Sequence, residues 1–273
     1  MSNMLIHNYT IPVKGIKKKI IYHFSDIHLT EYDDFSTEEE KKKAQVGTED
    51  WKNGRLWFAK DNKESVDDEL QLSSGEHLSN LISLSSQGDA FVMTGDICDY
   101  ISGANLRKLD VELKKSTVPY IAVCGNHDKA EDIPDGYVYS ALKEPVQTLD
   151  LGDIMIVGFD DSTGKISQYQ LEQFKNLLNL NKHLIITLHI PIMTEENAER
   201  LIKCGEYFRL NNESATAEVY EFIDLIKQNS DKIVAVLAGH LHFKNNSEIM
   251  PGLMQYVSTQ GLLGNINRYE IGE

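Results

Sequence analysis

The sequence is poor in several features that would fix its class at once. It has three cysteines at wide spacing, Cys98, Cys124 and Cys204. Neither a zinc ribbon nor a disulfide framework can be built from them, so a reducing compartment is expected. The first ten residues lack a basic segment followed by an apolar one, and no run has the length of a membrane span. These absences predict a cytoplasmic protein with no membrane partner.

Positive charge is also scarce. Lys and Arg number 27 against 42 Asp and Glu, which gives a formal net charge of −15 at pH 7. This excess of acid argues against a nucleic-acid polymer as partner, because surfaces that neutralise phosphates need Lys and Arg. If the substrate is an anion, the positive charge must be local, and bound metal ions are the obvious source.

The chain does have enough apolar material for a sizeable core, with 273 residues of which 41% are hydrophobic. That length fits one large α/β domain or two small ones, and we expect one domain over residues 1–273. A polar, aromatic stretch at about 30–63 is longer than an ordinary loop and is predicted to be an insertion. It holds both tryptophans, Trp51 and Trp57. Its aromatic residues form either a wall over a functional site or a flap packed on the domain flank.

Short apolar runs alternate with helical patterns along the chain, which is typical of an α/β fold. Strands are expected at 5–13, 20–25, 90–93, 120–123, 154–159, 184–188, 233–238, 248–257 and 265–271, the last two antiparallel and edge-like. Helices are expected at 65–83, interrupted or ended near Gly75, and at 105–116, 167–180 and 215–228, with Ser214 as the N-cap of the last.

Polar clusters follow several of these strands. The run Cys-Gly-Asn-His-Asp at 124–128 follows the strand at 120–123, and Gly125 is expected to let the backbone turn sharply there. Open α/β folds place their ligands at this carboxyl edge of the sheet. Four other segments also follow expected strands: Asp26-Ile27-His28, Gly95-Asp96, His189 and Gly239-His240-Leu241-His242.

Together these turns carry the ligand types of a metal centre, namely Asp26, His28, Asp96, Asn126, His189, His240 and His242. Imidazole suits zinc, iron and manganese, and a shared carboxylate can bridge two ions that need about four to six ligands each. Two divalent ions roughly 3.5–4 Å apart can hold a hydroxide and clamp the oxygens of a displacement at phosphorus. Taken singly, a histidine is more often structural, and we assign His7, His23, His77 and His183 to that class.

The ordered series resembles the calcineurin-like metallophosphoesterase superfamily. Its motifs are Asp-x-His, Gly-Asp, Gly-Asn-His-Asp/Glu, a lone His and Gly-His-x-His, and all occur here in that order from Asp26 to His242. The resemblance implies a four-layer αββα sandwich of two mixed β-sheets flanked by helices. It also implies two divalent ions, which are manganese, iron or zinc.

The resemblance further implies a role for each motif residue. The first ion would be bound by Asp26, His28 and His242, with Asp96 as the bridge, and the second ion by Asn126, His189 and His240. His127 would be free to protonate the leaving-group oxygen, oriented by Asp99, while Asp128 would support the ligands from behind.

Departures from the pattern indicate which branch of the superfamily the chain resembles. Tyr100 stands where the serine/threonine protein phosphatases of the superfamily carry arginine, and Asp128 stands where they carry glutamate. The chain is therefore more similar to the bacterial phosphodiesterase-type members. Ile190 occupies a position where many relatives have a second histidine, so one contact to the substrate is expected to be missing.

The motifs of other enzyme classes are incomplete in this sequence. Residues 158–165 suggest a phosphate-binding loop, but the glycine spacing is wrong and Ile166 replaces the required Ser or Thr. No Gly-x-Ser-x-Gly elbow occurs. With 42 acidic residues, carboxylate pairs arise anyway, so a glycosidase has no specific support.

The sequence therefore predicts a dimetal phosphoesterase that acts on a small phosphodiester or nucleotide. Alternatives are a phosphomonoesterase or nucleotide pyrophosphatase of the same fold, or a scaffold that binds metal without catalysis. A scaffold has no reason to keep His127 and Asp99, which favours the enzyme. The substrate, the native metals and the oligomeric state are left open.

Overall fold

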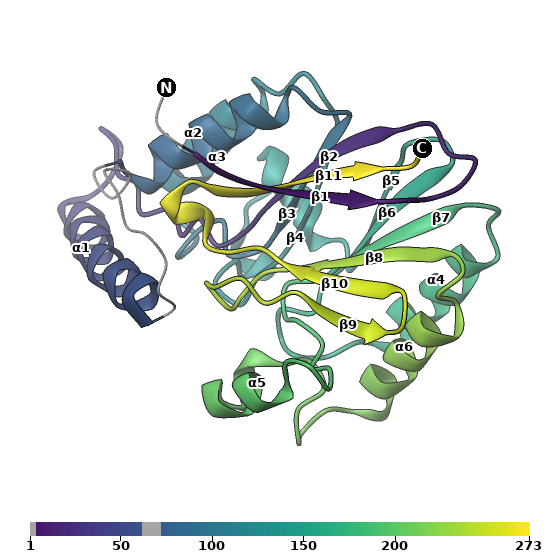
Figure 1. Ribbon diagram of the computed structural model, residues 1–273. Helices are drawn as coiled ribbons and strands as arrows, with labels where there is room; N and C mark the ends of the chain where they lie inside the picture. The colour runs from purple at the N-terminus through teal and green to yellow at the C-terminus, as the bar shows by residue number, and fades with distance from the viewer. Residues whose placement is uncertain (1–3, 62–71) are drawn as a thin grey trace.

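The computed structural model describes residues 4–61 and 72–273, whose strands form two sheets (Figure 1). The first sheet has the order β1-β11-β2-β3-β4, with β1 (Leu5–Ile11), β2 (Lys19–Phe24), β3 (Ala90–Thr94), β4 (Tyr120–Val123) and β11 (Asn265–Ile271). The second has the order β5-β6-β7-β8-β10-β9, with β5 (Val146–Asp150), β6 (Ile154–Phe159), β7 (His183–Thr187), β8 (Ile233–Ala238), β9 (Ser247–Met250) and β10 (Leu253–Val257).

Both sheets are mixed. Strands β2, β3 and β4 run parallel, and β11 lies antiparallel to β2. In the second sheet β6, β7, β8 and β10 run parallel, while β5 and β9 lie antiparallel to their neighbours. The loops after β2, β3 and β4 therefore leave one edge of the first sheet together, and those after β7 and β8 leave one edge of the second.

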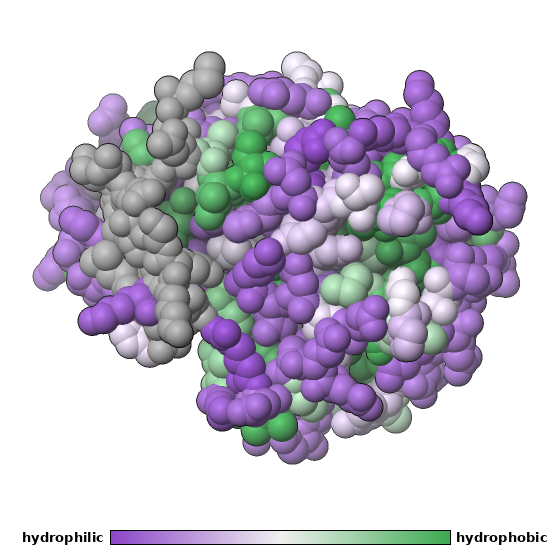
Figure 2. All heavy atoms as spheres, in the orientation of Figure 1, coloured by the Kyte–Doolittle hydropathy of each residue, from purple (hydrophilic) through white to green (hydrophobic). Residues whose placement is uncertain are grey.

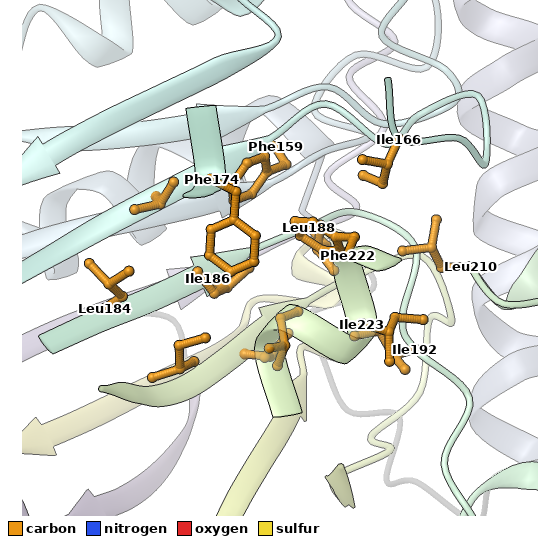
Figure 3. Packing of buried hydrophobic residues seen from close by; sticks show 14 of the residues in the cluster. Phe159, Ile166, Phe174, Leu184, Ile186, Leu188, Ile192, Leu210, Phe222 and Ile223 are labelled. Carbon is orange, nitrogen blue, oxygen red and sulfur yellow. The ribbon is translucent and has the colours of Figure 1, made fainter. Parts of the chain in front are cut away.

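Helices cover the outer face of each sheet, and apolar clusters fill the spaces between the layers. Helices α2 (Ser74–Ser85) and α3 (Gly103–Leu113) pack on the first sheet, and α4 (Gln168–Leu178) and α6 (Ala217–Gln228) pack on the second. Figure 3 shows Phe174 of α4 and Phe222 of α6 beside Ile186 and Leu188 of the second-sheet cluster. A third cluster, which includes Ile21, Val92, Ile156 and Tyr269, joins residues of the two sheets. The expected four-layer sandwich is confirmed.

Helix α1 (Glu38–Asp61) lies apart from the sheets at one end of the molecule (Figure 1). It carries acidic residues in its first turn, where their negative charge interacts favourably with the positive end of the helix dipole. Its contacts with the body are specific: Lys43 Nζ lies 3.7 Å from the centroid of the Tyr100 ring, and the hydroxyls of Thr30 and Thr48 are 2.8 Å apart. Most of the stretch expected to be an insertion is therefore one helix attached at several points.

The ends of two helices differ from expectation. Helix α2 begins at Ser74, because Ser73 and Glu76 form a capping box, so Gly75 lies in its first turn and does not interrupt it. The earlier part of the helix expected at 65–83 falls partly outside the described residues. Helix α6 has Thr216 as its N-cap and not Ser214.

Three further differences concern elements that polar residues or short length concealed. The run 248–257 is a hairpin of two strands, and β5 and the short helix α5 (Ala198–Cys204) were not expected. Strand β11 is not an edge but lies between β1 and β2. Its polar residues misled the prediction: Asn267 is buried because its Nδ2 donates to the Tyr269 hydroxyl at 3.0 Å.

The surface agrees with the acidic composition, since hydrophilic residues cover most of the face drawn in Figure 2. Among the described residues, no helix combines the length and the apolar character needed to cross a membrane. The three cysteines are free thiols, and burial raises the pKa of Cys98 and Cys124, which act as small core residues.

Candidate metal centre

The predicted ligands lie where the ends of the two sheets meet. One group contains Asp26, His28 and His242, from the loops after β2 and β8. The Nε2 atoms of His28 and His242 are 3.1 Å apart, and His242 Nε2 lies 3.2 Å from Asp26 Oδ1. We call these three residues the first half-site.

A second group contains Asn126, His189 and His240, which we call the second half-site. His189 Nε2 lies 3.0 Å from His240 Nδ1 and 3.1 Å from Asn126 Oδ1. Asp96 connects the two groups, because its Oδ2 is 3.7 Å from His28 Nε2 and 3.4 Å from His189 Nε2. One carboxylate oxygen thus faces both half-sites.

These distances fit bound divalent ions. Ligand nitrogens about 2.1 Å from a metal, at angles between octahedral and tetrahedral, lie about 3.0–3.4 Å from each other. The facing imidazole nitrogens are 3.0 and 3.1 Å apart. In addition, Asp26 Oδ1 is buried and makes no hydrogen bond of good geometry; its neighbour is the His242 imidazole at 3.2 Å, and a cation would stabilise this carboxylate. The donor set is therefore suited to zinc, iron or manganese.

Several residues of the site have a backbone conformation that is rare for residues other than glycine. Among residues 4–61 and 72–273, five non-glycine residues have positive φ, and all are predicted ligands: Asp26 at 55°, His28 at 47°, Asp96 at 50°, His240 at 72° and His242 at 57°. Each left-handed residue costs about 1–2 kcal/mol relative to the right-handed region. Such strain persists where the surrounding structure over-determines it, which is typical of functional sites.

Two glycines of the site are needed because neighbouring loops approach them closely. A Cβ on Gly125 would lie 2.1 Å from Asp96 Oδ1, and one on Gly239 would lie 1.9 Å from Ser25 Oγ. The chain does turn at Gly125, whose carbonyl accepts the N–H of Asp128 at 3.1 Å, but the positive φ in this region belongs to Gly95, at 89°. The absent side chain at Gly125 lets the loops after β3 and β4 touch.

Hydrogen bonds behind the ligands fix which nitrogen faces the site. His189 Nδ1 donates to the carbonyl of Thr94 at 2.7 Å, and His240 Nε2 donates to the carbonyl of Tyr207 at 2.8 Å. The opposite nitrogen of each ring therefore points at the other ring. Such partners orient ligating histidines and raise their basicity.

Two buried aspartates hold the ligand loops. Asp128 accepts hydrogen bonds from the backbone N–H groups of Ile97, Cys98 and Gly125, as its predicted supporting position implies. Asp161 accepts from the N–H groups of His189 and Ile190, and the sequence analysis missed it. Its position two residues after the end of β6, where other strands carry their motifs, was the available signal.

The electrostatics of the buried site also demand positive charge. Burial alone would raise the pKa of Asp26, but the His242 imidazole lowers it to about 2. Burial likewise lowers the pKa of His189, yet the Asp96 carboxylate raises it to about 10. The buried carboxylates thus favour positive charge at this site, and a metal ion can supply that charge in place of a proton.

His127 projects at the border of the two half-sites. Its Nδ1 lies 2.9 Å from the carbonyl and 3.1 Å from the carboxylate of Asp99, so Nδ1–H donates to this residue and Nε2 stays available. The same carboxylate oxygen is 3.3 Å from His28 Nδ1. Burial opposes protonation of His127, but Asp99 and Asp96 raise its pKa to about 9.

Helix α1 places Trp51 directly on the first half-site. Its ring centroid is 3.8 Å from that of His28, nearly stacked at 29°, and 5.3 Å from that of His242. The Trp51 side chain also hydrogen-bonds Asp99. Of the two interpretations of the 30–63 stretch, the wall over the site agrees with the position of Trp51.

The comparisons with known proteins agree with this geometry. The family model described as Metallophos, calcineurin-like phosphoesterase, matches residues 20–244. The chain belongs to this family. It is therefore a metal-dependent phosphoesterase, which confirms the predicted family and enzyme class, and membership of the family implies two divalent ions.

Individual relatives are more distant. A Coxiella burnetii (strain RSA 493 / Nine Mile phase I) protein named "Probable cyclic nucleotide phosphodiesterase" is 28% identical over 180 residues, which span 62% of this chain and 66% of that protein. A dimetal phosphatase from Danio rerio matches with a TM-score of 0.56 and 11% identity, and the match covers 89% of this chain and 88% of the phosphatase chain. The protein TT1561 of Thermus thermophilus has a TM-score of 0.50 and 13% identity, covering 90% of this chain and 91% of its own. At these identities, the likeness to the two solved structures shows the fold alone.

Proposed function

We propose that this phosphoesterase hydrolyses a small phosphodiester or nucleotide-type phosphoester, with both half-sites loaded and His127 as general acid. The observation that carries the proposal is the convergence of the predicted ligands, whose facing atoms lie 3.0–3.7 Å apart. His127 lies beside them, close to His28 and Asp99, and we assign it to proton transfer because Asp99 holds its Nδ1. The Coxiella burnetii relative, named as a cyclic nucleotide phosphodiesterase, supports a nucleotide-type substrate.

The ligand roles follow from position. Asp26, His28 and His242 would hold one ion, Asn126, His189 and His240 the other, and Asp96 both. When bound, these ions supply charge for the phosphoryl oxygens and a nucleophile derived from water at neutral pH.

The chain's own contribution to the chemistry is to position a proton. Asp99 accepts the hydrogen bond from His127 Nδ1–H, which fixes the ring and leaves Nε2–H as the atom that can protonate a departing oxygen. The shared contact of Asp99 with His28 couples the acid to the first half-site. Trp51 excludes water from the side of His28 that it covers.

Two related proposals complete the assignment. We treat residues 1–273 as one catalytic domain in which 30–63 is an insertion. The free thiols support a reducing, cytoplasmic location.

Metal reconstitution tests the proposal. Protein stripped with a chelator is reloaded with manganese, zinc or iron, and bound metal is counted by elemental analysis. Turnover is then measured on bis(p-nitrophenyl) phosphate, a cyclic nucleotide, p-nitrophenyl phosphate and a dinucleoside polyphosphate. We expect turnover that requires two equivalents of metal and is higher for the diesters. Two bound equivalents without turnover on any ester would favour the non-catalytic scaffold, and preference for p-nitrophenyl phosphate would favour a phosphomonoesterase.

A further inference from the structure

A cavity of about 380 Å³ begins at Asn126 and His240 of the second half-site. It extends between two segments, the loop 162–165 after β6 and the segment 206–214 after α5. Its size lies at the small end of the roughly 300–1,000 Å³ range of small-molecule sites. One group about the size of a nucleoside fits such a space, and a polymer does not.

The two walls differ in chemical character. The first wall, residues 162–165, is Ser-Thr-Gly-Lys, and it offers two hydroxyls and the Lys165 ammonium. Lys165 is exposed and makes no ion pair with any residue in the described ranges 4–61 and 72–273. By contrast, the guanidinium of Arg209 is occupied by the carbonyls of Leu201 and Gly205 and by the Glu213 carboxylate. Lys165 is therefore the lining cation that remains to meet an anion.

The second wall carries Glu206 and Tyr207. The Tyr207 side chain is 84% exposed, although its backbone carbonyl is fixed by the hydrogen bond from His240. An exposed aromatic ring on an anchored backbone provides a stacking surface for a planar base. The Glu206 carboxylate can accept hydrogen bonds from ribose hydroxyls or base N–H groups.

Both walls are tied to the second half-site. Asp161, which holds the backbone of His189 and Ile190, also accepts the N–H of Gly164 through its carbonyl at 2.7 Å. Gly164 adopts a φ of +70°, and a Cβ built on it would meet nothing within 4 Å, so the turn faces open space. A ligand with its reacting phosphoryl group at Asn126 would therefore reach the loop 162–165 and Tyr207 from one position.

We propose that this cavity binds the part of a nucleotide substrate that is not attacked, with the base on Tyr207 and a second phosphate against Lys165. The substrate class is thus a nucleotide that carries a phosphate beyond the scissile one, such as a dinucleoside polyphosphate. This inference rests on the proposed function for the position of the scissile phosphate. The 162–165 segment, which fails as a nucleotide-binding loop in sequence, takes on a phosphate contact through its place beside the metal centre.

Binding measurements test the proposal independently of turnover. Calorimetry compares the affinity of the metal-loaded and metal-free protein for ADP and for AMP, which differ by one phosphate. Replacement of Lys165 by Met should weaken ADP binding by about 10-fold, the loss of one charge-assisted hydrogen bond, and leave AMP binding nearly unchanged. Lys203→Met on α5, whose ammonium pairs with Glu199, is the matched control and should change neither affinity.

Kinetics with the same variants complete the test. Lys165→Met and Tyr207→Ala should raise the KM for a dinucleoside polyphosphate, while the KM for bis(p-nitrophenyl) phosphate stays within about twofold. Equal loss of ADP and AMP affinity in Lys165→Met would overturn the proposal, because it would place Lys165 on the phosphate that both ligands share. Unchanged ADP affinity in that variant would also overturn it. If no ester is turned over but ADP binding depends on Lys165, the proposed function fails and the cavity assignment stands.

Discussion

The two halves of the proposed metal centre contain similar candidate ligands but differ in their exposure to solvent. In the first half-site, Asp26, His28 and His242 are 0%, 1% and 7% exposed, and Trp51 lies on the His28 ring. In the second half-site His189 is buried, but Asn126 is exposed, His240 is partly exposed and the cavity begins at both.

This difference assigns distinct tasks to the halves. A buried set of ligands interacts more strongly with a cation because the local dielectric constant is low, so the first half-site is suited to hold its ion. Under the proposed function, a substrate would approach the second half-site, where the cavity begins. Helix α1 therefore covers the first half-site, whereas the segment around Tyr207 borders the open side of the second half-site.

Replacement of Asp96 by Asn should remove the metal ions from both half-sites, and with them the difference between the two. One anionic oxygen faces both groups of ligands, and its charge is lost in the variant. We expect metal affinity in each half to fall by more than the roughly 10–100-fold that loss of an outer-shell partner costs, and turnover to vanish with it. Elemental analysis and single-turnover assays measure both effects.

Asp153→Asn is the control, because the Asp153 carboxylate is exposed and is distant in sequence from Asp96. This variant should bind metal normally. Retention of one full equivalent of metal by Asp96→Asn would show that Asp96 serves a single half-site.

Replacement of His127 by Asn separates proton transfer from metal binding. The ring lies at the border between the halves and contacts Asp99 but belongs to neither proposed ligand set. The rate on alkyl or nucleoside esters should fall by roughly 10²–10⁴-fold, the usual share of a positioned acid. Aryl esters, whose leaving groups need no proton, should lose much less.

Metal content should stay normal in this variant, which elemental analysis checks. Loss of an ion, or equal loss of rate on aryl and alkyl esters, would mean that His127 holds metal or substrate.

Replacement of Asp161 by Asn should weaken the second half-site selectively. Its two carboxylate oxygens accept the N–H groups of His189 and Ile190, and an amide would turn a donor toward one of them. We expect affinity for the second ion to fall by about 10–100-fold while the first ion is retained. Titration of the apoprotein, followed by metal counting, distinguishes the two ions by stoichiometry.

Asp160→Asn is the matched neighbour, because the Asp160 carboxylate accepts the N–H of Ser162 within its own loop and not that of a metal ligand. Equal weakening of both ions by Asp161→Asn would indicate a general loss of structure and not a local one.

Asp161 also shows where prediction from the sequence ends. The motif residues were recognisable because metal chemistry restricts residue types and order, and strands of four to seven residues could be located from apolar runs. A supporting carboxylate has no such restriction, since any acceptor at that point would satisfy two N–H groups. The positive φ of the five ligands is equally invisible, because it is imposed by contacts between loops that are distant in sequence.

The same limit applies to the fold. Strand β11 looked like an edge because several of its residues are polar, but two of them are buried with hydrogen-bond partners: Asn267 donates to the Tyr269 hydroxyl and Asn265 donates to the Gln260 carbonyl. For the 30–63 stretch, the aromatic residues suggested two roles, but a helical pattern alone does not say which face meets the body. Contacts at Thr30, Thr48 and Tyr100 decide that Trp51 lies on His28.

The smallest effect is expected at Trp51, whose replacement should make the first half-site resemble the second. Stacking of an aromatic ring on a partner is worth about 0.5–1.5 kcal/mol, so Trp51→Ala should weaken the first ion by roughly 2- to 10-fold and speed its release. Trp51→Phe keeps a ring over His28 and should lie between the two. The chain has only two tryptophans, so in a Trp57→Phe background the emission of Trp51 reports on this half-site alone.

In that background, manganese should quench the emission as the first half-site fills, and Asp161→Asn should leave this early phase unchanged. Trp57 is 62% exposed, so its replacement serves as the control for loss of an indole from α1. If Trp51→Ala releases its first ion no faster than Trp57→Phe does, the indole does not retain the ion. The enclosure of the first half-site would then be due to the burial of Asp26 and His28 between the sheets, and α1 would be a packing flap.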